Sequence, residues 1–277
     1  MSELRRQKAN AFRAMHHSGK ILVLPNVWDV ASARVIEEAG FEAIATSSAA
    51  VAFSLGYPDG QAISRDEMLA RVARIARSVK VPVSADVEAG YGRKPEDAAA
   101  TARGVIEAGA VGMNLEDGTD DPQHPLVDLS LQLEKIRAVR EAALESSILL
   151  VLNARTDVYL AEVGAPELHY GETVRRLLAY RDAGADCVFA PGLRDTETIS
   201  QLVRDVQCPV NILAGPGYPS VPELAKLGVM RVSLGSGPMR ATLGLLQRMA
   251  EELKASGTYA AFEGSLPYAG ANRLFTK

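Results

Sequence analysis

Three short apolar runs of this 277-residue chain each end in charged side chains. Carboxylates that gather in one place repel one another, so burying them requires a counter-charge such as a divalent cation. Several carboxylates together form the hard-oxygen site that Mg²⁺ or Mn²⁺ prefers, and an arginine among them offers a forked cation suited to a substrate carboxylate or phosphonate. The charged residues are, in chain order, Asp86, Glu88, Glu116, Asp117, Arg155 and Asp157.

The first of these runs, residues 81–92, reads Val-Pro-Val-Ser-Ala-Asp-Val-Glu-Ala-Gly-Tyr-Gly. It begins as a buried strand should and breaks at Gly90 and Gly92. Side chains at positions i and i+2 of a strand point to the same side, so Asp86 and Glu88 would leave the strand end together. The alternative is a solvated loop that carries two surface acids.

Arg155 also has two interpretations. It could face the reacting group of a substrate, or it could pair with Asp157 or Glu116 in a ring of salt bridges. Asp59, on the loop after the second strand, could reach the same place and add a further carboxylate.

The elements that must position these residues alternate between short apolar strands and amphipathic helices. The pattern predicts strands at 21–25, 43–48, 81–86, 111–115, 148–154, 187–189, 210–213 and 230–234. It predicts helices at 3–17, 31–39, 64–79, 95–108, 130–144, 172–183, 196–206, 222–227 and 239–255, with a loop at 49–60.

Eight strand–helix units without a change of composition favour one closed α/β domain, a (β/α)₈ TIM barrel over residues 1–277, with a leading helix within 1–20 and a tail at 257–277. A doubly wound open sheet is the alternative, but no G-x-G-x-x-G pattern follows the first strand. In such barrels the reactive groups lie at the carboxyl ends of the strands, where the charged residues stand.

Composition excludes several classes of protein. The net charge of −4 argues against nucleic acid or an acidic membrane surface as a partner. No run approaches the 18 apolar residues that a membrane-spanning helix needs. The charged N-terminus lacks a signal-peptide core, so a cytoplasmic location is expected. Cys187 and Cys208 lie in apolar runs and should be buried reduced thiols.

The histidines are few. His124 lies in the polar loop 119–126 and could serve as an acid–base group of a lid or could simply be exposed. His16, His17 and His169 lie in segments that read as surface.

Taken together, these residues resemble the isocitrate lyase / phosphoenolpyruvate mutase superfamily over nearly the whole chain. The pieces that carry the resemblance are Ser47-Ser48-Ala49, Gly56-Tyr57-Pro58-Asp59, the stretch from Asp86 to Gly92, Asn114-Leu115-Glu116-Asp117, Ala154-Arg155-Thr156-Asp157 and the stretch from Tyr180 to Asp186.

The resemblance implies a barrel whose last helix is exchanged between subunits, in homodimers or homotetramers. It also implies a Mg²⁺ site, with Mn²⁺ as an alternative, at Asp86, Glu88 and Glu116, and a small carboxylic acid as substrate. Catalytic roles are expected for Arg155, Glu116, Tyr57 and His124. Substrate contacts are expected at Ser47, Ser48, Ala49, Asp59, Gly90, Tyr91, Arg155 and Asn211.

The loop after the fourth strand departs from the superfamily pattern. Residues 118–125, Gly-Thr-Asp-Asp-Pro-Gln-His-Pro, carry neither the lid cysteine of the lyases nor the basic lid of the mutase. Glu88 stands where the pattern has Asp, and Pro191-Gly192 replaces an acidic pair. Decarboxylation or cleavage of a small 2-oxo or 2-hydroxy dicarboxylate such as oxaloacetate needs the metal and Arg155 but no lid cysteine.

We therefore expect a Mg²⁺-dependent carbon–carbon lyase that forms an enolpyruvate intermediate. Phosphonopyruvate mutase or hydrolase chemistry is the second hypothesis. A barrel that binds a ligand without turnover is the third.

Overall fold

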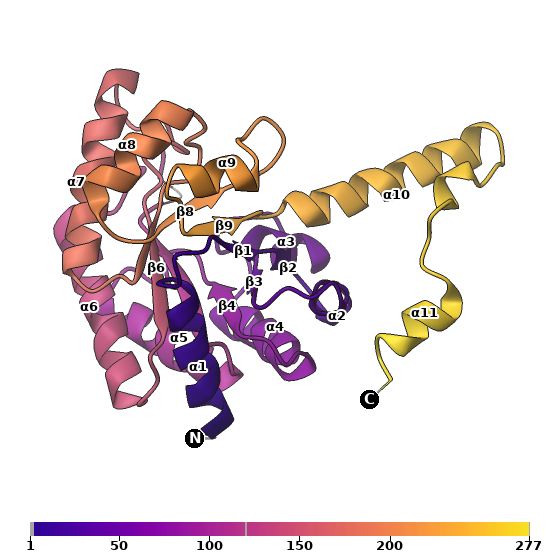
Figure 1. Ribbon diagram of the computed structural model, residues 1–277, viewed down its shortest axis with the longest axis horizontal. Helices are drawn as coiled ribbons and strands as arrows, with labels where there is room; N and C mark the ends of the chain where they lie inside the picture. Colours follow the sequence, from indigo (N-terminus) through magenta and orange to yellow (C-terminus); the bar gives the residue numbers. More distant parts are fainter. Residues whose placement is uncertain (1–2, 120, 277) are drawn as a thin grey trace.

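The computed structural model describes residues 3–119 and 121–276, and within them nine parallel strands form one sheet that closes into a TIM-like barrel (Figure 1). The nine strands correspond to the eight strands of a barrel, because the first barrel strand is interrupted at Pro25 and is divided into β1 and β2. β1 (Leu22–Leu24) pairs with β9 (Arg231–Ser233), and β2 (Asn26–Val27) pairs with β3 (Ile44–Thr46). Proline has no N–H to donate to a sheet ladder, which accounts for the break. The predicted barrel is confirmed.

The remaining strands are β4 (Val83–Asp86), β5 (Gly112–Glu116), β6 (Val151–Arg155), β7 (Cys187–Phe189) and β8 (Val210–Leu213). The helices are α1 (Glu3–Met15), α2 (Val30–Glu38), α3 (Ser48–Ser54), α4 (Arg65–Ser78), α5 (Pro95–Ala108), α6 (Leu129–Glu145), α7 (His169–Asp182), α8 (Thr196–Val206), α9 (Val221–Lys226), α10 (Gly237–Ala255) and α11 (Tyr268–Arg273), with 3₁₀ turns at Pro166–Leu168 and Ala260–Phe262.

Local sequence signals set several helix ends. Ser64 accepts a hydrogen bond from the N–H of Glu67, whose side chain returns to Ser64, so the predicted capping box starts α4. Pro95 is the first residue of α5, and Gly109 ends it with a φ of 98° in the left-handed region that glycine adopts without strain.

Strand register places the charged residues in two rows inside the barrel. Asp86 of β4 is the partner of Asn114, which is the partner of Asn153. One step toward the carboxyl ends, Glu116 of β5 is the partner of Arg155 of β6. Residues paired in a parallel ladder share a face, so Asp86, Glu116 and Arg155 all point into the same end of the barrel.

Two predictions about local structure were wrong. Residues 49–60 are not all loop, because Ser47 caps a helix, α3, whose backbone begins at Ser48. His16 and His169 are not on the surface, since they are 1% and 7% exposed. His16 follows Phe12 by one helical turn, and its Nδ1 lies 2.8 Å from the Phe12 carbonyl oxygen, whereas the ring of His169 packs edge-on against Tyr159.

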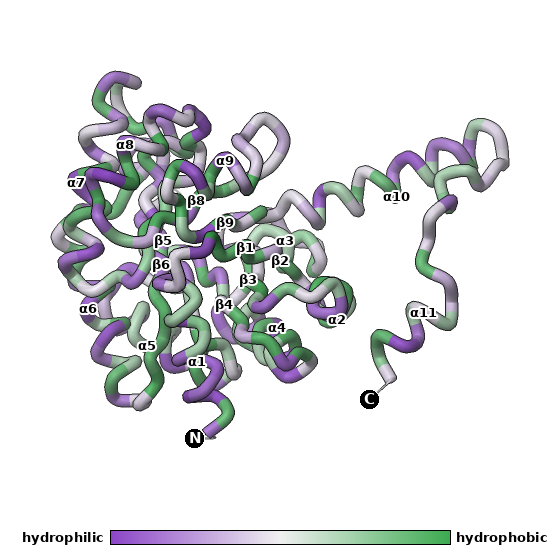
Figure 2. Tube along the Cα trace, viewed as in Figure 1, coloured by the Kyte–Doolittle hydropathy of each residue, from purple (hydrophilic) through white to green (hydrophobic). Residues whose placement is uncertain are grey.

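The last long helix leaves the barrel. α10 extends away from the strands, and the chain then turns back through α11 (Figure 1). Met239 is the one buried residue among its nineteen, and green apolar positions alternate with purple polar ones along it (Figure 2). No helix among the described residues is long and apolar enough to cross a membrane.

Candidate active site

Asp86 lies at the end of β4, and three hydrogen-bond donors orient its carboxylate. The N–H and the hydroxyl of Ser48 both donate to Oδ2 at 2.9 Å. The side-chain amide of Asn114 donates to Oδ1 at 3.2 Å. The N–H of Asp86 donates in turn to Thr46 Oγ1 at 2.8 Å, so the residue is held on both sides. The start of α3 and the row of β5 therefore fix this acid together.

Glu88 sits two residues beyond Asp86 in a tight turn. β4 ends at Asp86, so the prediction that strand alternation carries Asp86 and Glu88 off the strand together was wrong. Its φ is 52°, in the left-handed region that non-glycine residues rarely adopt. Its carboxylate accepts hydrogen bonds from the main-chain N–H of Gln61 and from the hydroxyl of Tyr91, the latter at 3.1 Å. Burial raises the pKa of Glu88 to about 7, and the charge of Asp86 adds to the rise.

Glu116 and Asp157 share one arginine. Glu116 Oε2 lies 2.6 Å from a terminal nitrogen of Arg155, and Asp157 accepts from Nε at 2.5 Å and from Nη2 at 2.9 Å. The same guanidinium lies 5.9 Å from the ring centre of Phe189. Arg155 therefore forms both of the ion pairs that the sequence left open, one with Glu116 and one with Asp157. These pairs fix the guanidinium at the carboxyl-terminal end of the barrel (the mouth), beside the acids.

The electrostatics of the mouth show an excess of negative charge. Burial raises the pKa of Glu116 well above its ordinary value, Arg155 opposes the rise, and Asp157 and Asp86 add to it. Burial disfavours the charged form of Arg155, but Glu116 and Asp157 outweigh it and raise its pKa. Partial desolvation of its carboxyl group raises the pKa of Asp59 too, and the charge of Asp86 adds to the rise, although the residue as a whole is exposed at the rim.

The charge excess is the observation that favours a cation here. The carboxylates of Asp86, Glu88, Glu116 and Asp157 outnumber the two guanidinium groups near them, Arg155 and Arg231, and a divalent ion would balance the surplus. Across residues 3–119 and 121–276, no three acidic, histidine or cysteine side chains already stand in a ligand geometry. Mg²⁺ keeps several of its waters when it binds proteins. Any ion at this mouth would therefore be bound partly through water, and Asp86, Glu88 and Glu116 stay the predicted ligands.

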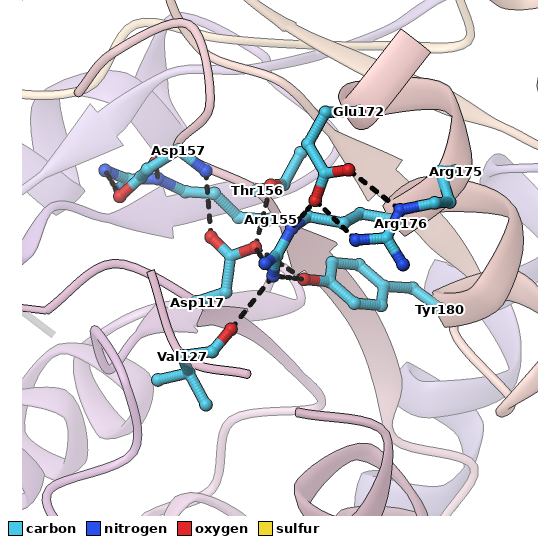
Figure 3. A network of polar contacts seen from close by, with 9 residues as sticks. All are labelled: Asp117, Val127, Arg155, Thr156, Asp157, Glu172, Arg175, Arg176 and Tyr180. Carbon is cyan, nitrogen blue, oxygen red and sulfur yellow. Dashed lines mark hydrogen bonds and ion pairs between the residues drawn. The ribbon is translucent and has the colours of Figure 1, made fainter. Parts of the chain in front are cut away.

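Asp117 does not join this group, although the sequence predicted it there with the other acids. It is fully buried and faces α7 (Figure 3). Its carboxylate accepts hydrogen bonds from Tyr180 at 2.5 Å, from Arg176 at 3.0 Å and from residues 156 and 157. Neighbouring residues at a strand end point to opposite faces, so Glu116 and Asp117 separate.

The other predicted substrate residues lie around the same end. Ser47 caps α3 and accepts a hydrogen bond from the N–H of Ala50 at 3.3 Å, and Ala49 is buried in the first turn. Tyr57 is 44% exposed beyond the end of α3. Asn211 is buried and donates to Ser233 at 3.0 Å.

His124 lies on a short closed loop. The N–H of Thr119 donates to the carbonyl of Pro125 at 2.9 Å, and Gly118 pairs with Leu126 across the loop. His124 is exposed, and among the described residues no hydrogen bond or ion pair joins its ring to the acids. Its catalytic role stays a prediction.

Sequence reasoning missed a fully buried cation, Arg231. Its Nη2 lies 3.4 Å from both Ser84 Oγ and Asn114 Oδ1, and no carboxylate of the described chain pairs with it. Burial lowers its pKa, and Cys187 and Asp86 oppose that effect. An arginine inside residues 230–234, which were predicted as a buried strand, is a signal that could have indicated it.

Known proteins resemble this chain in both sequence and fold. The profile of the phosphoenolpyruvate phosphomutase family matches residues 12–254. The chain belongs to this family. The predicted resemblance to the isocitrate lyase / phosphoenolpyruvate mutase superfamily is thereby confirmed.

Relatives of this phosphoenolpyruvate phosphomutase family member differ in activity. A crystal structure from Burkholderia cenocepacia J2315, described provisionally as a lyase/mutase, is 41% identical, superposes with a TM-score of 0.94 and covers 100% of this chain and 98% of its own. The oxaloacetate decarboxylase of Pseudomonas entomophila (strain L48) is 30% identical over 79% of this chain and 75% of its own. A phosphonopyruvate hydrolase crystallised with oxalate and Mg²⁺ is 25% identical, with a TM-score of 0.84 and coverage of 96% and 94%.

Proposed function

We propose that this protein is a Mg²⁺-dependent lyase that breaks a carbon–carbon bond of a small 2-oxo dicarboxylic acid, with oxaloacetate as the favoured substrate. One observation carries the proposal: Asp86 and Glu116 lie at the ends of neighbouring strands, Glu88 lies in the turn just beyond Asp86, and the guanidinium of Arg155 pairs with Glu116. The similarity to an oxaloacetate decarboxylase and to a hydrolase bound to oxalate and Mg²⁺ supports this substrate class and this ion.

Each side chain has a defined task in this scheme. Asp86, Glu88 and Glu116 hold the cation, and Ser48 and Asn114 keep Asp86 oriented toward it. When bound, Mg²⁺ supplies Lewis-acid stabilisation of the negative charge that develops on the substrate. Arg155 remains charged and offers a fixed donor array at the reacting end, because Asp157 holds its Nε and Nη2 in place.

The reaction requires a bond to break, charge to be stabilised and a proton to be delivered. In decarboxylation, the bond to the departing carboxylate breaks, CO₂ leaves, and the electron pair becomes an enolate that then takes a proton on carbon. The hydroxyls of Tyr57 and Tyr91 and the ring of His124 are the candidate proton donors. Of these, Tyr91 lies beside the acids, with its hydroxyl on Glu88.

A substrate screen tests the proposal. Oxaloacetate and related dicarboxylates are offered with Mg²⁺ and with EDTA, and pyruvate is measured. We expect turnover of oxaloacetate that EDTA abolishes. Phosphonopyruvate followed by ³¹P NMR is the companion assay, because only cleavage or migration of the phosphorus–carbon bond changes its phosphorus signal. A changed signal without oxaloacetate turnover would favour phosphonate chemistry, and metal binding without any turnover would favour a binding barrel.

We further propose that the molecule assembles as a homodimer or homotetramer through α10. Leu243, Leu246 and Leu253 of this helix are exposed, at 44%, 61% and 44%. α10 extends away from the strands (Figure 1), so an equivalent α10 from a second copy could take the place on the barrel where the last helix would ordinarily pack. Light scattering behind a sizing column tests this, and a monomer at micromolar concentration would contradict it.

A further inference from the structure

A buried lysine forms hydrogen bonds with the main chain of the turn that carries Glu88, residues 88–92. Lys135 of α6 is 1% exposed, and its ammonium donates to the carbonyl oxygen of Ala89 at 2.5 Å and to that of Gly92 at 3.3 Å. Burial lowers the pKa of Lys135, and the charges of Asp97 and Glu116 oppose that effect. A buried ammonium is costly unless hydrogen bonds compensate it, and both of these go to this turn.

A second helix completes the anchorage. Thr101 of α5 is fully buried, and its hydroxyl donates to the carbonyl oxygen of Gly90 at 2.8 Å. The carbonyl groups of residues 89, 90 and 92 therefore each accept a hydrogen bond from a side chain of a helix that surrounds the barrel. Helices α5 and α6 lie side by side, so the two anchors act from adjoining supports.

The turn needs such support because its backbone is strained. Glu88 and Tyr91 both adopt left-handed conformations, with φ of 52° and 55°, although neither is glycine. Such residues persist only where the surrounding structure determines them, and they cluster at functional sites. Gly90, between them, has a φ of 89° and leaves only 3.1 Å between an added Cβ and Leu115.

We propose that Lys135 and Thr101 are positioning residues, a clamp that holds the turn so that Glu88 and Tyr91 face the cation site. The inference rests on the proposed function, since it takes Glu88 to be one of the groups that hold the metal ion. Both clamp residues are buried, and each acts through the carbonyl groups of the turn.

The sign of the effect separates this role from a simple electrostatic one. Lys135 carries a positive charge near the acids, so removing that charge alone would strengthen the binding of a divalent cation. Releasing the turn would instead weaken binding, because Glu88 would lose its position. Thr101→Val removes a donor without changing charge or size, and so reports on position alone.

The experiment is a titration of the full-length protein with Mn²⁺, with free Mn²⁺ measured by its electron paramagnetic resonance signal. We expect Lys135→Met to weaken binding about 10-fold or more and Thr101→Val to weaken it in the same direction, as loss of groups that support metal ligands does. Lys94→Met, at an exposed position beside the same loop, serves as the matched charge control and should bind like the wild type.

Circular dichroism is recorded for each variant. If Lys135→Met fails to fold, Thr101→Val decides. Wild-type protein that binds no Mn²⁺ would overturn the proposed function and the clamp with it. If the wild type binds Mn²⁺, and Lys135→Met and Thr101→Val both bind it as tightly or more tightly, the clamp alone is overturned.

Discussion

Arg155 grips Asp157 with two hydrogen bonds, Nε to Oδ1 at 2.5 Å and Nη2 to Oδ2 at 2.9 Å, which leaves the third guanidinium nitrogen on Glu116 at 2.6 Å. The main-chain N–H of Asp157 donates at 2.9 Å to Asp117, which is anchored in turn by Tyr180 and Arg176 (Figure 3). The orientation of the guanidinium is therefore determined by a buried network that reaches α7.

Replacing Arg155 by lysine should abolish most of the activity while leaving a positive charge in place. An ammonium cannot hold Asp157 through two parallel bonds and offer a third donor to the mouth. We expect kcat for oxaloacetate to fall about 100-fold or more, the scale for losing one preorganised donor. Steady-state kinetics measure it, and an Arg155→Lys enzyme within about threefold of the wild type would remove Arg155 from the mechanism.

The hydroxyl of Tyr180 should matter for stability. Tyr180→Phe takes one donor from the fully buried Asp117, and hydrogen bonds to a charged group contribute about 1.5–3 kcal/mol. Tyr170→Phe is the matched control, because Tyr170 donates to Asp205 in an exposed pair and its loss should cost less than about 1 kcal/mol. Urea unfolding of both variants measures the difference, and equal losses would show that Asp117 does not depend on Tyr180.

His16 should make the fold acid-sensitive. Burial lowers its pKa to about 3, and the nearby charge of Arg231 adds to the effect. Between about pH 6.5 and pH 3 the unfolded chain takes up a proton at this ring and the folded protein does not. The free energy of unfolding should therefore fall as the pH drops through this window, by up to about 1.4 kcal/mol per pH unit from this residue.

His16→Phe keeps a ring at this position and removes its titration. Urea titration at several pH values measures the free energy of unfolding of both proteins. As the pH falls below about 6.5, the wild type should lose more of this free energy than the variant does. A difference that stays constant from pH 7 to pH 4 would show that His16 takes up a proton in the folded protein.

His124 offers a test of the loop after β5. Its ring is exposed, so if the loop stays as the structure shows it, His124→Gln should leave kcat within about threefold of the wild type, because surface substitutions rarely matter. If the loop closes over the substrate and His124 delivers the proton, kcat should fall about 100-fold or more. Oxaloacetate kinetics across pH 6–8 distinguish the two.

The barrel could be predicted from the sequence because its signals are local. The predicted bounds of α5 and α8 agree with the structure, since Pro95 and Gly109 mark one helix and Asp195 caps the other. Strand β7 was likewise predicted over its exact range, 187–189. α3 was missed because its small residues resemble a loop, although Ser47 at its start was an available N-cap signal.

The details of the site depend on contacts that no local pattern encodes. Asp117 turns away from Glu116, which strand alternation could have predicted, but its partners Arg176 and Tyr180 come from α7, far along the chain. Lys135 stands on the apolar face of α6 between Gln132 and Val139, and only a lone charge in that stripe hinted at its burial.

If Asp86, with Glu88 and Glu116, holds a divalent cation opposite Arg155, the decisive comparison is between the wild type and Asp86→Asn. Calorimetric titration with Mg²⁺ and oxaloacetate turnover are measured on both proteins, with Glu141→Gln on the exposed face of α6 as the control for loss of one negative charge. We expect Mg²⁺ binding and turnover in the wild type and the control, and neither in a folded Asp86→Asn protein. Mg²⁺ binding by Asp86→Asn equal to that of the wild type would contradict it.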